Sequence, residues 1–221
     1  MPLSYHIFYS IAILLSWIAR VWCRWQVVGI ENVPKKGPLL IVANHINLAD
    51  IPLLTVSLGR KAIFMAKEEL FRSKFVGYFL RSFGSFPVRR GQPDRRALHQ
   101  AQKLLAEGGA LIVFPEGKRS KNAQLQPAFL GAALIASRNG APILPVGICG
   151  TEKIRNLASV LRRPQVVVNI GQPFYPPSAN PELSKTELIE FTDLIMRRIA
   201  ELLPPEYRGD YPSKEIEQRE N

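Results

Sequence analysis

The stretch LLIVANHINLADIPLL, residues 39–54, combines an apolar run with a polar group that such a run rarely carries. The apolar residues 39–43 lead directly into Asn44 and His45, and Asp50 follows just before a second apolar segment. On a single helix, a spacing of five residues would place His45 and Asp50 about 140° apart. The two side chains can meet only if His45 lies in the loop that leaves a strand and Asp50 lies in the first turn of the next helix.

A histidine beside a carboxylate at this position has a chemical use. The carboxylate fixes the tautomer and orientation of the imidazole, which leaves the second ring nitrogen available to take a proton. Ligands of α/β folds bind at the carboxyl ends of the strands, where this loop would lie. The alternative is that His45 is only a structural loop residue, since one His-Asp spacing is weak evidence by itself.

Strand and helix patterns alternate along the rest of the chain. The predicted strands are WQVVGI (25–30), LLIVAN (39–44), AIFMA (62–66), GSFPV (84–88), ALIVFP (110–115), ILPVGIC (143–149) and VVVNIG (166–171). Helices are predicted over 49–58, 69–83, 94–107, 124–138 and 184–203, with Asp94 and Ser184 as N-caps. This alternation predicts an α/β fold, with a mixed, mostly parallel sheet flanked by helices.

Three further segments place residues of interest in or directly after predicted strands. SFPVRRGQ places Arg89 and Arg90 after one strand, and GALIVFPEGKRS places residues 116–119 after another. APILPVGI places Pro145 within a third strand. Because the strand ends share one edge of a parallel sheet, several of these groups are expected to converge on one pocket. GKRS lacks the glycine spacing and final residue of a phosphate-binding P-loop.

The charge predicts an anionic partner. The 221 residues carry a net charge of +11, and residues 60–103 hold eleven basic and three acidic residues, a net +8. This block could be a solvated face, or it could contact phosphates or an anionic bilayer. Nucleic acid is disfavoured, because no nucleic-acid-binding motif is present and aromatic residues do not alternate with the basic ones.

The N-terminal segment is strongly apolar, and its first charged residue is Arg20. Its charges follow the apolar run, whereas a secretory signal has them before it. Tryptophans at 17, 22 and 25 favour a helix that spans a membrane or lies in its interface; a buried core helix is the alternative. We expect a membrane-associating helix over 1–24, one catalytic domain over 25–203, and a polar tail over 204–221. The arginines after the apolar run predict the cytoplasmic face of the cell membrane.

Four motifs together carry a resemblance to a known family. NHINLAD, FPVRRG, FPEGKRS and APILPVGI, in this order and spacing, resemble the motifs of the glycerolipid acyltransferases over about residues 25–175. The bacterial 1-acylglycerol-3-phosphate acyltransferases are the most similar group. The resemblance implies that His45 is the catalytic base and that Asp50 is its partner. It implies substrate-binding roles for Asn44, Lys67, Arg90, Glu116, Gly117, Arg119 and Pro145. Lys118 departs from the family pattern, which usually has a small residue there.

The resemblance also implies the reaction. A fatty acyl group would pass from a thioester, acyl-CoA or acyl-carrier protein, to the free hydroxyl of lysophosphatidic acid within a membrane. Cys149 ends an apolar run and is expected to be a core residue, so we expect direct transfer without an acyl-enzyme. Neither a metal nor a cofactor is expected. Another acceptor (glycerol-3-phosphate, a lysophospholipid or an aminoacyl lipid) and a non-catalytic membrane-binding protein of the same fold are the alternatives.

Overall fold

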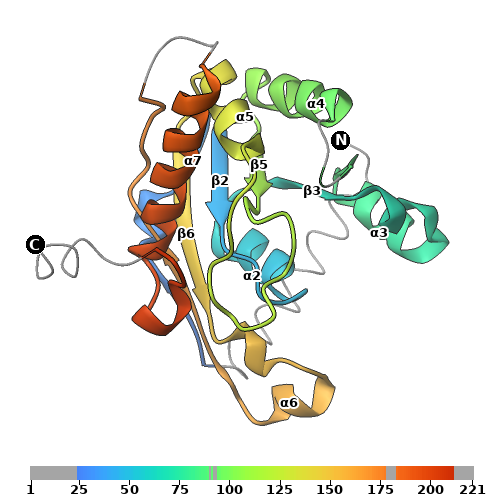
Figure 1. Cartoon of the computed structure of the whole chain (residues 1–221). Helices are drawn as coiled ribbons and strands as arrows, with labels where there is room; N and C mark the ends of the chain where they lie inside the picture. Colours follow the sequence, from blue (N-terminus) through green and yellow to red (C-terminus); the bar gives the residue numbers. More distant parts are fainter. Residues whose placement is uncertain (1–23, 90, 92–93, 178–182, 212–221) are drawn as a thin grey trace, which may run out of the picture.

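The computed structural model describes residues 24–89, 91, 94–177 and 183–211, which form a seven-stranded sheet covered by helices (Figure 1). The strand order is β1-β7-β6-β2-β5-β3-β4. The strands are β1 (Arg24–Val28), β2 (Leu39–Ala43), β3 (Ile63–Lys67), β4 (Phe86–Val88), β5 (Ala110–Val113), β6 (Ile143–Cys149) and β7 (Gln165–Ile170). All seven predicted strands are therefore confirmed, with small differences at their ends.

The strands run in two directions. β2 is parallel to β5 and β6, and β3 is parallel to β5 and β4. β7 is antiparallel to β6, and β1 pairs in parallel with β7. The sheet is thus mixed and mostly parallel, as predicted. The carboxyl ends of β2 to β6 consequently point to the same edge, which Figure 1 shows as the end of the sheet where α2 follows β2.

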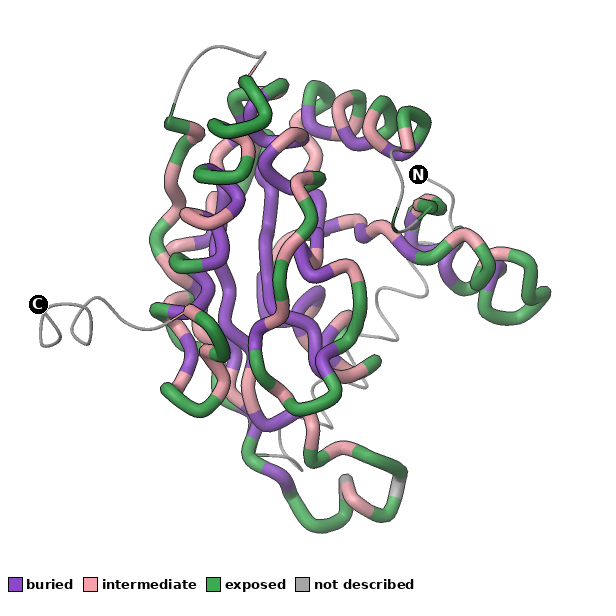
Figure 2. Tube along the Cα trace, viewed as in Figure 1, coloured by how far each residue is buried: buried purple, intermediate pink, exposed green. Residues whose placement is uncertain are grey.

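Helices cover both faces of the sheet. Leu40 and Val42 of β2 belong to a core formed with α4 (Arg95–Ala106), α5 (Gly131–Asn139) and α7 (Lys185–Ala200). Leu39 and Ile41 belong to a second core that includes residues of α2 (Asp50–Ser57) and α3 (Lys74–Ser82). A strand covered on both faces has no solvent-facing side, which explains the unbroken apolar sequence of β2. Figure 2 shows the buried central strands between these layers.

Shorter elements connect the main ones. One short α-helix, α6 (Leu157–Leu161), precedes β7, and the 3₁₀ helices are η1 (Ile30–Asn32), η2 (Glu68–Arg72), η3 (Thr151–Lys153) and η4 (Pro205–Tyr207). The predicted N-caps are confirmed. Asp94 accepts hydrogen bonds from the backbone of Arg96 and Ala97, and Ser184 forms a capping box with Glu187.

Two predicted helices need correction. The helix predicted over 69–83 is divided into η2 and α3, because Ser73 is extended and caps α3 through its side chain. The helix predicted over 124–138 begins only at Gly131. Backbone N–H groups before it are engaged elsewhere: Leu125 donates to Tyr207 O and Phe129 donates to Pro115 O. Residues 124–130 therefore form a loop.

The predictions for the two ends of the chain have different outcomes. The membrane-associating helix predicted over 1–24 lies almost entirely outside the described residues. Among the helices that are described, none has the length and apolarity needed to cross a membrane. Residues 204–211, assigned by sequence to the tail, contact the body: Tyr207 receives the Leu125 N–H, and its hydroxyl donates to Glu152 Oε1.

The burial of β2 leads to a testable prediction about stability. Leu40 of β2 is fully buried against the layer of α4, α5 and α7. We expect Leu40→Ala to lower the free energy of unfolding by about 2–5 kcal/mol, because it removes apolar contact and leaves a cavity. Urea denaturation followed by circular dichroism measures the change. The control is Ile189→Ala on the exposed side of α7, which should stay within about 0.5 kcal/mol of wild type. A loss of less than about 1 kcal/mol for Leu40→Ala would contradict this packing.

Candidate active site

His45 and Asp50 meet at the carboxyl edge of the sheet. His45 lies in the loop after β2, and Asp50 is the first residue of α2. Their side chains are bonded, with Asp50 Oδ2 2.8 Å from His45 Nδ1, and both residues are buried. The predicted placement of the pair, one residue in the loop and one in the first turn, is therefore confirmed.

A single oxygen of Asp50 organises this loop. Oδ2 also accepts the backbone N–H groups of Ile46 and Asn47, both at 2.7 Å. An ionised carboxylate only accepts hydrogen bonds, so its contact with the ring places the imidazole proton on Nδ1. The other ring nitrogen, Nε2, then carries the lone pair that can take a proton from a substrate.

The imidazole is held from its face as well as from Nδ1. The ring stacks on Phe114, with 4.2 Å between centroids and 22° between planes. Within the described part of the chain, no group makes a hydrogen bond to Nε2. The contacts fix the ring at two sides, and Nε2 has no competing partner among the residues that the structure describes.

Glu116 supports His45 from behind. Its side chain is fully buried, Oε1 accepts the His45 N–H at 2.8 Å, and Oε2 accepts the Gln126 N–H at 3.0 Å. Burial raises the pKa of Glu116 to about 7, against the two backbone hydrogen bonds, which lower it. Both oxygens are thus committed to the protein backbone. The structure places Glu116 as a brace between two loops, and the substrate-binding role that the resemblance implies for it stays a prediction.

Asn44 is a second brace. Its buried side chain donates to Ile148 O at 2.8 Å and accepts the Ile148 N–H at 2.7 Å. The amide therefore continues the β2–β6 pairing one step past the end of β2. Both polar ends of the Asn44 side chain are occupied by β6, so it fixes the height of the His45 loop above the sheet.

The loop after β5 brings Gly117 and two cations to the same edge. Gly117 has φ +65°, and a Cβ there would lie 2.8 Å from the Phe129 ring, so only glycine fits without rearrangement. Lys118 and Arg119 follow and are exposed. The next residue, Ser120, donates its backbone N–H to His45 O at 2.7 Å, which ties this basic loop to the histidine.

The remaining predicted site residues are Lys67, Arg90 and Pro145. Lys67 ends β3 at the same edge and forms an ion pair with Glu69 at 3.1 Å. Arg90 lies outside the described residues. Pro145 is buried inside β6 opposite Val42, three residues before Ile148, and the structure does not bring it to the His45 loop.

Several supporting residues were missed by sequence reasoning. Asn47 accepts the Ala49 N–H and donates to Ile154 O, which links the His45 loop to the segment after η3. Phe114 and Gln126 were missed because their contacts come from loops that no sequence period describes. Asparagine side chains often accept a hydrogen bond from the backbone two residues further on, and this turn preference could have identified Asn47.

Other chemistries have little support among the described residues. No group of three or more His, Cys, Asp or Glu side chains is assembled there for a metal ion. Burial raises the pKa of the Cys149 thiol, which disfavours the nucleophilic thiolate. The arrangement instead suits removal of a proton by His45 Nε2.

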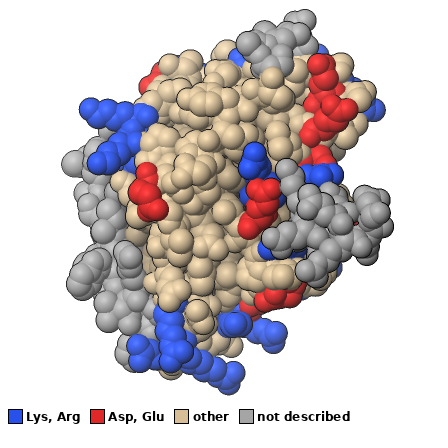
Figure 3. Space-filling model, turned by 90° about the vertical axis from the view of Figure 1, so that its left-hand side faces the viewer, with Lys and Arg blue, Asp and Glu red and all other residues tan. Residues whose placement is uncertain are grey.

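Positive charge gathers at the same end of the molecule. Figure 3 shows Lys and Arg side chains at the lower end of one face, at the height of α6 in Figure 1. The segment from η3 to β7 contributes exposed basic residues there: Lys153, Arg155, Arg162 and Arg163. This end of the protein therefore favours anionic molecules.

The structure combines a mixed α/β sheet with a buried His-Asp pair and a basic loop at the carboxyl edge. Comparison with known proteins finds a family that matches this chain. The acyltransferase family model matches residues 24–149, more than half of the chain. The chain belongs to the acyltransferase family.

Several individual proteins are similar to this chain over most of its length. The chain is 31% identical over 178 residues to 1-acyl-sn-glycerol-3-phosphate acyltransferase of Bacillus subtilis, covering 80% of this chain and 87% of that protein. A chloroplastic enzyme of the same name, BAT2 of Brassica napus, is 32% identical over 72% of this chain. The chain spans about half the length of BAT2 and of a similar Arabidopsis thaliana protein.

A solved structure has the same architecture. The crystal structure of the 1-acyl-sn-glycerophosphate acyltransferase PlsC from Thermotoga maritima superposes with a TM-score of 0.67 at 30% sequence identity. The match covers 90% of this chain and 80% of that one. The α/β fold described above is therefore shared with a solved member of the family.

The raised pKa of Glu116 predicts a pH effect on stability. Between its ordinary value of 4.5 and about 7, the folded protein keeps this proton where the unfolded chain has released it. Stability therefore falls as pH rises through this window, by on the order of 1–3 kcal/mol. We expect Glu116→Gln to remove this part of the pH dependence, which urea unfolding of both proteins at pH 4.5 and pH 8 would measure.

The matched control is Glu190→Gln, at an exposed position of α7. It should show the same pH dependence as the wild type. Identical pH dependence in the wild type and Glu116→Gln would contradict a buried carboxyl that holds its proton near neutral pH.

Proposed function

We propose that the protein transfers a fatty acyl group from a thioester to the free hydroxyl of 1-acylglycerol-3-phosphate and so makes phosphatidic acid. Family membership and the printed activity of the bacterial relatives support this assignment. The observation that carries it is the His45–Asp50 pair, which leaves Nε2 available at the carboxyl edge of the sheet. The thioester is supplied by acyl-CoA or acyl-carrier protein.

In the proposed mechanism, His45 Nε2 takes the proton of the acceptor hydroxyl. The oxygen attacks the thioester carbonyl, a C–O bond forms, and the C–S bond breaks as the tetrahedral intermediate collapses. The proton then passes from the imidazolium to the leaving thiolate, so the base returns to its starting state. Asp50 stabilises the transient imidazolium from Nδ1, and its two backbone hydrogen bonds keep the carboxylate in place.

The proposed acceptor carries a phosphate, and cations near His45 are its proposed partners. Arg119 follows Gly117 in the loop that is tied to His45 through Ser120. The planar guanidinium can bind two phosphate oxygens at once. Lys67 and Arg90, which follow neighbouring strands, are proposed to add positive charge.

Both the product and the acceptor are membrane lipids, so we place the protein at the cytoplasmic face of the cell membrane. The apolar segment before Arg20 and the arginines that follow it support this placement. The segment itself lies outside the described residues, and its contribution to binding is part of the proposal.

Loss of the orienting carboxylate tests the mechanism. We expect Asp50→Asn to lower kcat by about 10²–10⁴-fold, because the amide cannot hold the imidazole tautomer and stabilise the imidazolium as a carboxylate does. His45→Ala should be at least as damaging. The measurement is turnover of labelled acyl-CoA and acyl-carrier protein with a panel of acceptors, and the lipid product is identified by mass.

The control is Asp210→Asn, an exposed position that should keep wild-type turnover. Circular dichroism and the thermal midpoint establish that the Asp50 and His45 variants are folded. If folded His45→Ala kept more than about a tenth of wild-type turnover, general-base catalysis by His45 would be excluded. Product from another acceptor, but none from 1-acylglycerol-3-phosphate, would reject the proposed substrate.

Arg119 tests the phosphate contact. We expect Arg119→Ala to raise KM for the phosphorylated acceptor by about tenfold or more, since a charge-assisted pair is lost, and Arg119→Lys to restore part of it. KM for the donor should change little. Arg138→Ala, an exposed arginine at the end of α5, is the matched control. An equal effect on an acceptor without phosphate would remove Arg119 from phosphate binding.

A further inference from the structure

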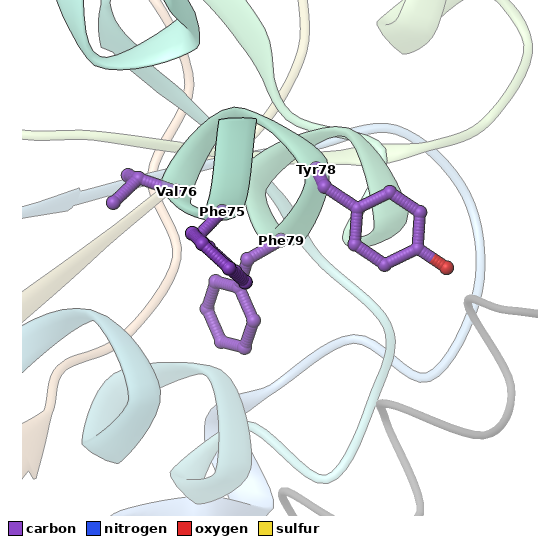
Figure 4. A pocket seen from close by; sticks show the side chains of 4 residues that line it. All are labelled: Phe75, Val76, Tyr78 and Phe79. Carbon is purple, nitrogen blue, oxygen red and sulfur yellow. The ribbon is translucent and has the colours of Figure 1, made fainter. Parts of the chain in front are cut away.

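Helix α3 presents large apolar side chains to the outside of the protein. Phe75 is 89% exposed, and Val76, Tyr78 and Phe79 are 43–57% exposed. Figure 4 shows these four side chains projecting from one helix. They line an open hollow of about 460 Å³. Leu70 of η2, which precedes α3, is also exposed. Contiguous apolar surface of this kind marks an interaction site.

The opposite side of α3 is fixed to the protein, so the outward side chains are displayed on a rigid support. Gly77 is buried against η2, where an added Cβ would come within 2.5 Å of Phe71 O. Arg81 donates to the same carbonyl, and Ser73 caps the first turn. Leu80 is buried in the core. The exposed face of α3 therefore results from how the helix is packed rather than from fraying.

The surroundings of this face are basic. Arg72, Lys74 and Arg81 are exposed on or beside α3. The nearby acids Glu68 and Glu69 are in ion pairs with Arg89 and Lys67, respectively. An occupant of the face should accordingly combine apolar groups with negative charge. Aromatic side chains beside Lys and Arg are typical of helices that lie in the interface of an anionic bilayer.

We propose that the exposed face of α3 inserts into the interfacial layer of an anionic membrane. Other occupants match its charge less well. A second copy would bring the three cations of each α3 towards those of its partner. Residues 1–23 contain no acidic residue that could oppose Arg72, Lys74 and Arg81. Anionic lipids supply both the apolar layer and the negative charge.

This contact would also orient the candidate active site. α3 and η2 follow the carboxyl end of β3, and His45 follows the carboxyl end of β2 at the same edge. A bilayer that receives α3 would lie beside the edge from which a lipid acceptor must reach His45. The inference rests on the proposed action on a membrane lipid, but its test reads membrane contact separately from turnover.

Spin labelling of the full chain tests insertion directly. A nitroxide is attached to Phe75→Cys in a Cys23→Ser/Cys149→Ser background, and a control label is attached to Ile189→Cys on α7. Vesicles contain phosphatidylcholine alone or with about 30% phosphatidylglycerol, which supplies the negative charge. Accessibility to oxygen and to a water-soluble nickel chelate reports the depth of each label.

The expected result is that the label at 75 loses access to nickel and gains access to oxygen on anionic vesicles, while the label at 189 stays aqueous. Two results would overturn the proposal. One is an aqueous label at 75 on protein that sediments with vesicles. The other is a label at 75 that is already shielded from nickel without vesicles, because residues 1–23 or a second copy would then cover the face.

Substitution provides the second test. We expect Phe75→Ser/Tyr78→Ser to weaken binding to anionic vesicles by about tenfold, because less apolar surface enters the interface. Phe75→Leu should retain binding, and Tyr175→Ser/Ile189→Ser, at exposed sites away from α3, should not change it. Turnover of a short-chain, water-soluble acceptor should be unchanged in all variants.

The outcomes separate the two proposals. Unchanged vesicle affinity in Phe75→Ser/Tyr78→Ser would reject membrane insertion by α3, whatever its turnover. Wild-type protein that inserts its label but acylates no acceptor would reject the proposed function and leave the membrane contact established.

Discussion

The buried carboxylate of Asp50 is the constraint on which the site depends. One oxygen receives the histidine ring and two backbone N–H groups, so the loop from His45 to Asn47 is bound to the first turn of α2. Burying a carboxylate is costly unless it is compensated, and these three donors compensate Oδ2, whereas the buried Oδ1 has no hydrogen-bond partner among the described residues. The same bonds that make the buried charge tolerable also orient the imidazole. The stability of the loop and the orientation of the imidazole therefore depend on the same hydrogen bonds.

Glu116 is a second buried carboxyl group, and it links segments that are distant in sequence. Its two oxygens receive the backbone of His45 and Gln126, while Ser120 closes the loop on His45 O. Asn44 adds a third link by bonding both backbone groups of Ile148. Under the proposed function, the groups that face the substrate are a ring nitrogen of His45 and a few exposed cations. Asn44, Asp50 and Glu116 hold the protein together at the points where strands end. Under the proposed function, they act on the reaction through the position of His45.

The sheet and the His-Asp geometry could be predicted because each has a local cause. Strands buried on both faces leave continuous apolar runs, and a five-residue spacing excludes a single helix for the pair. The roles of Glu116 and Asn44 could not be predicted in this way, because their partners are not close in sequence. Gln126 is 10 residues from Glu116, and Ile148 is 104 residues from Asn44. The loop over 124–130 was mistaken for helix because Tyr207, far along the chain, takes one of its N–H groups. The apolar residues of α3 have a helical period, but a period alone does not tell which side faces the core.

The strand order also determines when the site can form during synthesis. β2 precedes the His45 loop, yet its neighbours are β5 and β6, so the loop acquires both flanking strands only after residue 149 has been made. β1 waits longer, because its partner is β7, and Arg24 pairs with Gln165. Pairings between such distant segments form slowly, since a long stretch of chain must be closed before any contact is gained. A nascent chain whose first residues and His45 loop have already emerged therefore has no assembled sheet until most of its length has been made. During that interval the strands that will later be buried are exposed and prone to aggregation.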